Sequence, residues 1–170
     1  MFRNILVAID NSGASSSVLG LALDIANQNK ASITICTVVN YARVAPSAID
    51  MSGLGSSRMF EILRDDATRL LADALARAGE MDVAVRSMLL DGEPVSQILK
   101  IARGTRTDLI IVGSHGRRGF YRFMLGSVAE GVLRGSSVPV LIGRHHEPTS
   151  ADRTLKQLET HLPRPFTIQY

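Results

Sequence analysis

Two apolar stretches decide the fold class: Ile5-Leu6-Val7-Ala8-Ile9 near the start, and Asp108-Leu109-Ile110-Ile111-Val112-Gly113 late in the chain. Neither alternates between apolar and polar residues, which is typical of a parallel strand that helices cover on both faces. Asp10-Asn11-Ser12-Gly13 follows the first stretch directly, and these residue types favour turns and helix caps. The chain therefore carries buried parallel strands that end in polar turns.

Outward from these two strands, short β-branched runs alternate with longer amphipathic ones. The predicted strands span 5–9, 32–39, 83–90, 108–113 and 138–142; the predicted helices span about 15–29, 57–78, 94–104 and 127–134, and a long loop spans 40–57. This alternation predicts an α/β fold, a five-stranded parallel sheet in the order 3-2-1-4-5 with right-handed crossovers and helices on both faces. Ligands of such sheets bind at the carboxyl ends of the strands where the order reverses, here between strands 1 and 4. Asp10 and Gly113 fall at those ends.

The length of 170 residues predicts one domain over residues 1–144, followed by a C-terminal extension over 145–170. Within the extension only Thr154 to His161 has a helical pattern, and Pro148, Pro163 and Pro165 interrupt the rest. We expect the extension to be partly helical or loosely attached, or to dock on a partner or a second subunit.

Charge, hydropathy and cysteine content indicate which compartment and which classes of partner to expect. The net charge of +3 is too weak, by itself, to indicate nucleic-acid binding. No apolar run approaches the roughly 20 residues that span a bilayer. The single cysteine, Cys36, excludes an internal disulfide, and its place within a predicted strand favours an inert buried thiol. We expect a cytoplasmic protein with no membrane span.

A glycine-rich stretch, Gly113-Ser114-His115-Gly116-Arg117-Arg118-Gly119, links a strand to the region before the last helix. Backbone N–H groups in this context hold phosphates, and glycines let the backbone approach a ligand closely. Gly126 and Ser127 are expected to present free N–H groups at the start of the last helix, with arginines supplying positive charge. A structural alternative is a capping box, in which Ser127 and Glu130 only satisfy the helix end.

The spacing Gly113-x2-Gly116-x9-Gly126-Ser127 resembles the signature of the ATP-binding branch of the universal stress protein family. The first strand with its terminal Asp10, and Ser137-Val138-Pro139-Val140-Leu141-Ile142, are also similar to that family, so the resemblance covers about residues 2–144. It implies an adenine nucleotide as cofactor, ATP or its products ADP or AMP, with or without Mg²⁺, whose occupancy acts as a regulatory signal to an unknown protein partner. It also implies a homodimer through the last strand, Val138 to Ile142; the extension folded over that strand is the competing arrangement.

The resemblance further implies a role for each matching residue. Ala8, Ile9, Asp10 and Val38 would flank adenine and ribose; Val112, Gly113, Ser114, His115, Gly116, Arg117 and Arg118 would wrap the ribose and the inner phosphates; Gly126, Ser127 and Val128 would bind the outer phosphates. The residue types agree, because a carboxylate accepts hydrogen bonds from a base or ribose and a β-branched side chain offers an apolar wall. Asp10 has the alternative role of capping the first helix.

Enzymatic function is not indicated strongly. The chain has no Gly-Lys-(Ser/Thr) phosphate loop and no Ser-Gly-Gly-x-Asp-Ser loop after the first strand, so we assign no catalytic residue and no metal ligand. A slow ATP hydrolase or phosphotransferase, and an interaction module with a structural nucleotide, stay as alternatives. A flavodoxin-like carrier is disfavoured, because three Tyr, five Phe and no Trp leave few aromatic side chains to sandwich a flavin.

Overall fold

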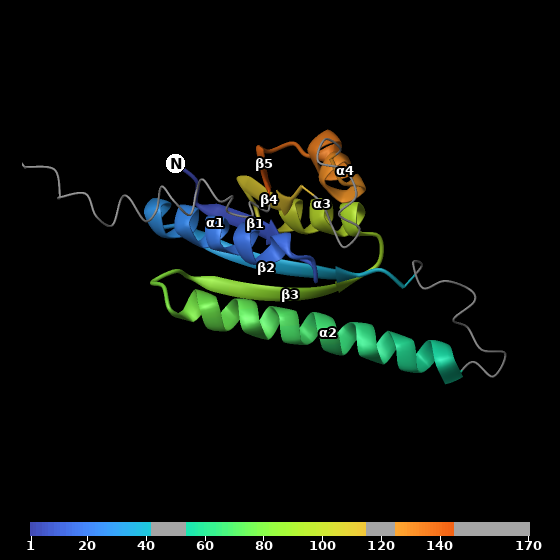
Figure 1. The fold of residues 1–170 in the computed structure, drawn as a ribbon. Helices are drawn as coiled ribbons and strands as arrows, with labels where there is room; N and C mark the ends of the chain where they lie inside the picture. The colour runs from blue at the N-terminus through green and yellow to red at the C-terminus, as the bar shows by residue number, and fades with distance from the viewer. Residues whose placement is uncertain (42–53, 115–124, 145–170) are drawn as a thin grey trace, which may run out of the picture.

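The computed structural model describes residues 1–41, 54–114 and 125–144, and these form a layered α/β structure (Figure 1). Its elements are β1 (Asn4–Ala8), α1 (Ala14–Asn29), β2 (Ser32–Val39), α2 (Leu54–Gly79), β3 (Val85–Asp91), α3 (Pro94–Gly104), β4 (Leu109–Gly113), α4 (Ser127–Gly135) and β5 (Val140–Gly143). The strands form one sheet in the order β3-β2-β1-β4-β5, and every neighbouring pair is parallel. The predicted fold class and strand order are confirmed.

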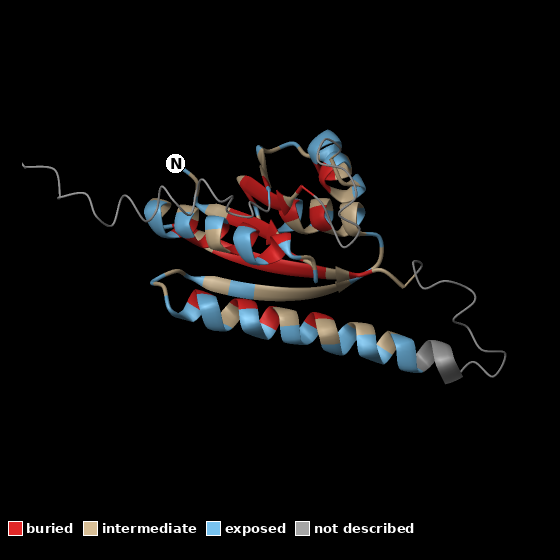
Figure 2. Cartoon of the chain, viewed as in Figure 1, coloured by how far each residue is buried: buried red, intermediate tan, exposed pale blue. Residues whose placement is uncertain are grey.

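The helices divide between the two faces of the sheet, and each face has its own apolar core. Alternate strand residues point to opposite faces, so Ile5, Val7 and Ile111 pack against α1 and α2, whereas Leu6 and Ile110 pack against α3 and α4. The central strands β1 and β4 are therefore apolar at nearly every position, and they are buried along most of their length (Figure 2). This two-sided burial is the physical reason for the unalternated stretches in the sequence.

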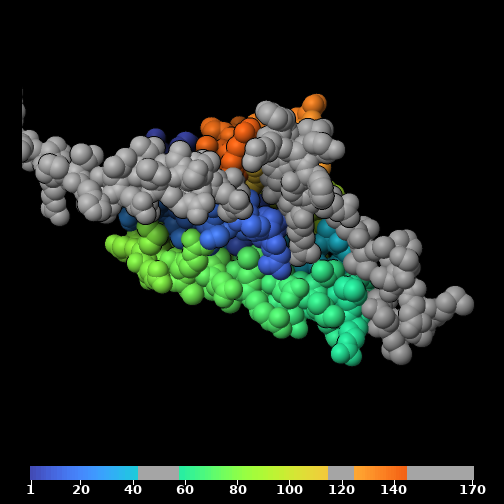
Figure 3. Space-filling view, viewed as in Figure 1, coloured from blue at the N-terminus to red at the C-terminus, as the bar shows by residue number. Residues whose placement is uncertain are grey.

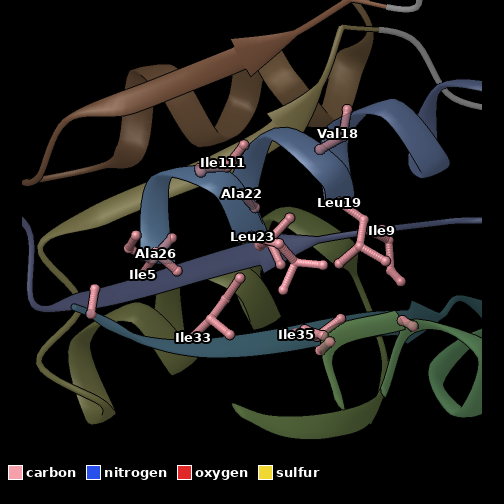
Figure 4. Close-up of a cluster of buried hydrophobic side chains, with 14 of the residues drawn as sticks. Ile5, Ile9, Val18, Leu19, Ala22, Leu23, Ala26, Ile33, Ile35 and Ile111 are labelled. Atoms are coloured by element: carbon pink, nitrogen blue, oxygen red, sulfur yellow. The ribbon is translucent and has the colours of Figure 1, made fainter. Parts of the chain in front are cut away.

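Helical spacing predicts that Val18, Leu21, Ala22 and Ile25 form the buried face of α1, and the structure differs from this prediction at Leu21. Val18, Ala22 and Ala26 lie one turn apart along the helix and pack onto the sheet (Figure 4). Leu21, which helical spacing also predicts to be buried, is 38% exposed. Leu19 and Leu23 take its expected place in the core.

Three predicted boundaries shift for local reasons. β5 begins at Val140 rather than 138, because the Ser136 hydroxyl accepts from Val138 N–H at 3.1 Å and donates to Val138 O at 2.7 Å, which turns the chain. β3 begins at Val85 rather than 83, after a turn in which Val83 N–H bonds Met81 O. α2 begins at Leu54, so the predicted loop 40–57 is shorter than expected, and its residues 42–53 lie outside the description.

Close packing of α4 on α3 depends on glycine at two positions of α4. A Cβ added at Gly131 would lie 2.7 Å from Val95 Cγ2, and one at Gly135 would lie 2.6 Å from Leu99 Cδ1. Glycine at both positions lets the helices approach more closely than any side chain would permit. α3 itself starts as predicted with Pro94 in its first turn, capped by the Glu93 carboxylate.

Along one side of the molecule, α2 runs beside α1 (Figure 3). No helix within the described parts of the chain is long and apolar enough to cross a bilayer.

Candidate functional site

The carboxyl ends of β1 and β4 meet in the middle of the sheet, where the strand order reverses. Ala8 is paired with Val112, the last such pair between the two strands. α1 leaves the end of β1 toward one face, and α4 lies on the other face. The helices that follow β1 and β4 thus lie on opposite faces of the sheet, and sheets of this type bind ligands at such a point.

Asp10 is held in the turn after β1 by two serines. Its Oδ1 accepts hydrogen bonds from Ser12 N–H at 3.2 Å, from the Ser12 hydroxyl, and from the Ser15 hydroxyl at 2.9 Å. Ser15 Oγ in turn accepts from Asp10 N–H at 2.9 Å, so side chain and backbone of Asp10 are tied to the same buried group. Among the described residues every hydrogen bond of the carboxylate goes to Oδ1, which leaves Oδ2 for a ligand.

The alternative role of Asp10 as a cap of α1 is wrong. The residue preceding the helix is Gly13, and no side chain accepts a hydrogen bond from the first turn. Asp10 instead organises the turn itself, because its carboxylate accepts from Ser12 N–H and from the Ser12 and Ser15 hydroxyls, and not from a backbone N–H in the first turn of α1. A half-buried carboxylate in a fixed orientation remains at the edge of the sheet.

The ends of the glycine-rich stretch are brought together by backbone hydrogen bonds. Ser114 N–H donates to Gly143 O at 2.7 Å, and Gly126 N–H donates to Ser114 O at 2.7 Å. The chain therefore returns to the end of β4 before α4 begins. His115, Gly116, Arg117 and Arg118, which were predicted to wrap the ribose and inner phosphates, lie outside the described residues.

The first turn of α4 is not capped by a side chain. Gly126 is the N-cap residue, and its carbonyl accepts the first helical hydrogen bond, from Glu130 N–H. The predicted capping box does not form, since the Glu130 carboxylate pairs with Arg134 at 2.9 Å instead. One expectation about the phosphate donors is wrong, because Gly126 N–H is bonded to Ser114 and is not free. The N–H groups of Ser127 and Val128 have no acceptor within the helix and are the donors that an anion would meet.

Val38 lies on the far side of β1, near the end of β2. Its side chain is half-buried and packs with the core between the sheet and α3 and α4. Ala8 packs in the same core, while Ile9 belongs to the opposite one. Val38 and Ala8 thus offer apolar surface on one side of the Asp10 turn.

A separate hollow of about 380 Å³ lies on the other side of that turn, between α1 and α2. Its apolar floor includes Ile9, Leu19 and Ala74, and Asp10 is at its edge. None of the predicted phosphate-binding residues lines it. It is therefore distinct from the predicted phosphate-binding end of the site.

Comparison with known proteins identifies the family. The family model described as "Universal stress protein family" matches residues 1–144. The universal stress protein YxiE of Bacillus subtilis is 33% identical over 148 residues, which cover 85% of this chain and 100% of that protein. The chain belongs to the universal stress protein family.

Solved structures share the fold. The hypothetical protein MJ0577 superposes with a TM-score of 0.72 at 23% identity, covering 86% of this chain and 99% of that one. A universal stress protein in complex with cAMP has a TM-score of 0.58 at 25% identity, with 84% and 97% covered. The universal stress protein of Archaeoglobus fulgidus in complex with dAMP has a TM-score of 0.59 at 21% identity, with 83% and 97% covered.

Sequence reasoning about this universal stress protein missed the serines that orient Asp10. The spacing Asp10-x-Ser12-x-x-Ser15 was a usable signal, because short hydroxyl side chains near an aspartate form local hydrogen-bonded turns. It also missed Gly143, whose carbonyl anchors Ser114 from the end of β5. No spacing in the sequence indicates that contact.

The remaining reactive groups of this universal stress protein offer little chemistry. Cys36 is fully buried in β2, and burial raises the pKa of its thiol to about 12, so the prediction of an inert thiol is confirmed. The described part of the chain contains no group of three or more His, Cys, Asp or Glu that could hold a metal ion. The site as described can bind and orient a ligand.

Proposed function

We propose that this universal stress protein binds an adenine nucleotide, ATP or its products ADP and AMP, at the edge between β1 and β4, and that occupancy acts as a regulatory signal. The observation that carries the proposal is the convergence of two unlike groups at the point where the strand order reverses. Asp10 offers a fixed carboxylate from one side, and the uncapped first turn of α4 offers backbone donors from the other.

The two groups fit opposite ends of a nucleotide. The N–H groups of Ser127 and Val128, at the positive end of the α4 dipole, suit phosphate oxygens. The carboxylate of Asp10 suits the hydroxyls of ribose or the amino group of a base, and Val38 supplies an apolar wall for the ring. The family structures bound to cAMP and dAMP support an adenine nucleotide, because both ligands join adenine to a phosphate.

The residues of this chain bind and orient rather than catalyse in the proposed function. No lysine follows the glycine-rich stretch in the arrangement that neutralises the outer phosphates in phosphate-loop enzymes. Mg²⁺, when present, would be held by the nucleotide's own phosphates. We therefore place hydrolysis, at most, as a slow side reaction, and a cytoplasmic location fits the single free thiol.

We also propose that two copies pair through β5. This strand lies at the end of the sheet and, among the described strands, pairs with β4 alone. An apolar edge strand in a protein free in water needs a cover, and the same strand of a second copy supplies one about a two-fold axis. The extension 145–170 of the same chain is the competing cover.

The proposed ligand is tested by the nucleotide content of the purified protein and by titration calorimetry. Acid release and chromatography should yield an adenine nucleotide, and Gly126→Ala should raise the Kd for ATP at least about tenfold, or about 1.4 kcal/mol. The added methyl group would stand where the phosphates approach the helix end. Gly104→Ala is the matched control, because a Cβ there meets nothing within 4 Å. Wild-type protein that binds no adenine nucleotide, or a Gly126→Ala variant that binds ATP as the control does, would contradict the proposal.

A further inference from the structure

The end of β2 extends past the end of β1. The ladder between the two strands stops at Ala8 and Cys36, with one further hydrogen bond from Ile9 N–H to Cys36 O at 2.9 Å. On its other side β2 continues to pair with β3 as far as Val39 and Asp91. The last residues of β2, Val38 among them, are thus supported by a strand on one side only.

The unsupported side of this strand end faces the turn that holds Asp10. β1 is the neighbour of β2 in the sheet, and Asp10 follows β1 two residues beyond its end. Asp10 and Val38, the two side chains that the proposed function assigns to the nucleoside, therefore lie on either side of the place where β1 has ended and β2 continues. The distance between them depends on where the end of β2 is held.

A cluster of side chains holds the end of β2 from the α2 side. We call it the β2 clamp and define it as Tyr41, Phe60, Arg64 and Asp91. Arg64 Nη1 lies 2.7 Å from Asp91 Oδ2, and the Tyr41 hydroxyl donates to Asp91 Oδ1 at 3.1 Å. The rings of Tyr41 and Phe60 meet edge to face with centroids 4.7 Å apart. Three elements, the chain after β2, the end of β3 and helix α2, are thereby joined at one carboxylate.

A backbone hydrogen bond beside the clamp also joins the ends of β2 and β3. Gly92, directly after Asp91, has φ +127°, a conformation that favours glycine, and its N–H donates to Val39 O at 3.0 Å. The pKa of Arg64 is raised by its side-chain interactions with Tyr41 first and with Asp91 second, so all three polar members act on one another. The β2 clamp is a connected unit rather than a single surface contact.

We propose that the β2 clamp is a positioning device for the nucleoside half of the proposed site. It fixes the end of β2 so that Val38 stands at the correct distance from Asp10. The inference rests on the proposed function. Arg64 and Phe60 act through β2 and not on the ligand, because α2 covers the face of the sheet opposite to the core in which Val38 packs.

A role in global stability alone is the competing explanation, and the exposure of the clamp argues against it. The side chains of Arg64 and Asp91 are 50% and 49% exposed. Ion pairs this accessible contribute little to folding free energy. A variant that loses the pair should therefore fold normally, and any effect on ligand binding can be measured in a folded protein.

The test compares Arg64→Met with Arg69→Met in the full chain. Arg69 is the matched control, because it forms an exposed ion pair with Asp66 on the same helix, at 3.6 Å, away from the β2 clamp. Arg64→Met and Tyr41→Phe should each raise the Kd for ATP by about two- to fivefold and leave the Kd for inorganic pyrophosphate unchanged. Arg64→Lys, which keeps a cation for Asp91, should retain the wild-type Kd. Amide hydrogen exchange at residues 38–41 should quicken in Arg64→Met and not in Arg69→Met.

The outcomes separate this inference from the proposed function. Wild-type protein that binds no adenine nucleotide would refute the proposed function, and with it the ligand role of the clamp. Wild-type protein that binds ATP, with Arg64→Met matching Arg69→Met in both Kd and hydrogen exchange, would overturn the β2 clamp alone. Equal weakening of ATP and pyrophosphate would also overturn it, since the effect would not be confined to the nucleoside half.

Discussion

Ser15→Ala should destabilise the protein far more than a serine substitution in a helix normally does. The Ser15 side chain is 8% exposed and makes two hydrogen bonds to Asp10, donating to Oδ1 at 2.9 Å and accepting from the backbone N–H at 2.9 Å. A hydrogen bond to a charged group contributes about 1.5–3 kcal/mol and a neutral one about 1 kcal/mol. Alanine recovers about 0.5 kcal/mol through its helix propensity. The net expected loss is about 2–3.5 kcal/mol.

This loss should appear as a fall in Tm of about 5–10 °C, measured by circular dichroism, for a domain of this size. Ser16→Ala is the matched control, because Ser16 is exposed and its side chain accepts a hydrogen bond from the exposed Arg77 on α2. Nucleotide affinity should fall in parallel, since Asp10 loses the group that orients its carboxylate. The double variant with Asp10→Asn should show less than the sum of the two single effects, because both remove the same interaction.

The reasoning fails if Ser15→Ala melts within about a degree of Ser16→Ala, a difference well below 1 kcal/mol. Additive losses in the double variant would likewise show that Ser15 and Asp10 act independently. Either result would mean that the Asp10 turn is held by groups other than the two serines.

Further expectations concern the thiol, the edge strand and the helix contact. Cys36 should react with a thiol reagent at pH 8 only after denaturation. Burial raises the pKa of its thiol from 9.0 to about 12, so its contribution to stability is complete below about pH 9 and is lost as the pH rises toward 12. The wild-type protein should therefore lose unfolding free energy relative to Cys36→Ala between about pH 9 and pH 12. The wild type should scatter light as a dimer of about 37 kDa, twice 18.4 kDa, and Val140→Lys should shift it toward monomer; a wild-type monomer at micromolar concentration would instead favour the extension as the cover of β5. Gly131→Ala should lower the free energy of unfolding by about 1–3 kcal/mol in denaturant titrations, because its Cβ would lie 2.7 Å from Val95 Cγ2, whereas Gly104→Ala should change it little.

The fold was predictable because its signals are local. Unalternated apolar stretches mark strands covered on both faces, and polar turns mark their ends, so a parallel sheet with right-handed crossovers follows from alternation and handedness. The order 3-2-1-4-5 is one of two common orders for such a sheet, and the pairing of β1 with β2 and β4 decides it. Leu21 shows the limit of periodicity: the spacing permits either Leu21 or Leu19 and Leu23 on the inner face, and only packing against the sheet decides.

The candidate site was predictable only in part, because its finer contacts are not local. Asp10 and the start of α4 follow from motif and strand position. The bond that occupies Gly126 N–H comes from Ser114, and Ser114 is itself anchored by Gly143 at the end of another strand. Such contacts depend on the finished tertiary structure. Gly126→Ala should therefore also lower the free energy of unfolding, because Gly126 is the N-cap of α4 and not a helical residue, and alanine is a poor N-cap.

The bond between Ser114 O and Gly126 N–H has a consequence in polymer terms. The bond joins the residue after β4 to the N-cap residue of α4 at 2.7 Å, so the separation between the two ends of the intervening chain segment is fixed. The entropy of closing a flexible loop grows only with the logarithm of its length, about 0.6 kcal/mol for each doubling. We therefore expect that a change in the number of residues between Ser114 and Gly126 costs little folding free energy, provided that this bond keeps the start of α4 in place.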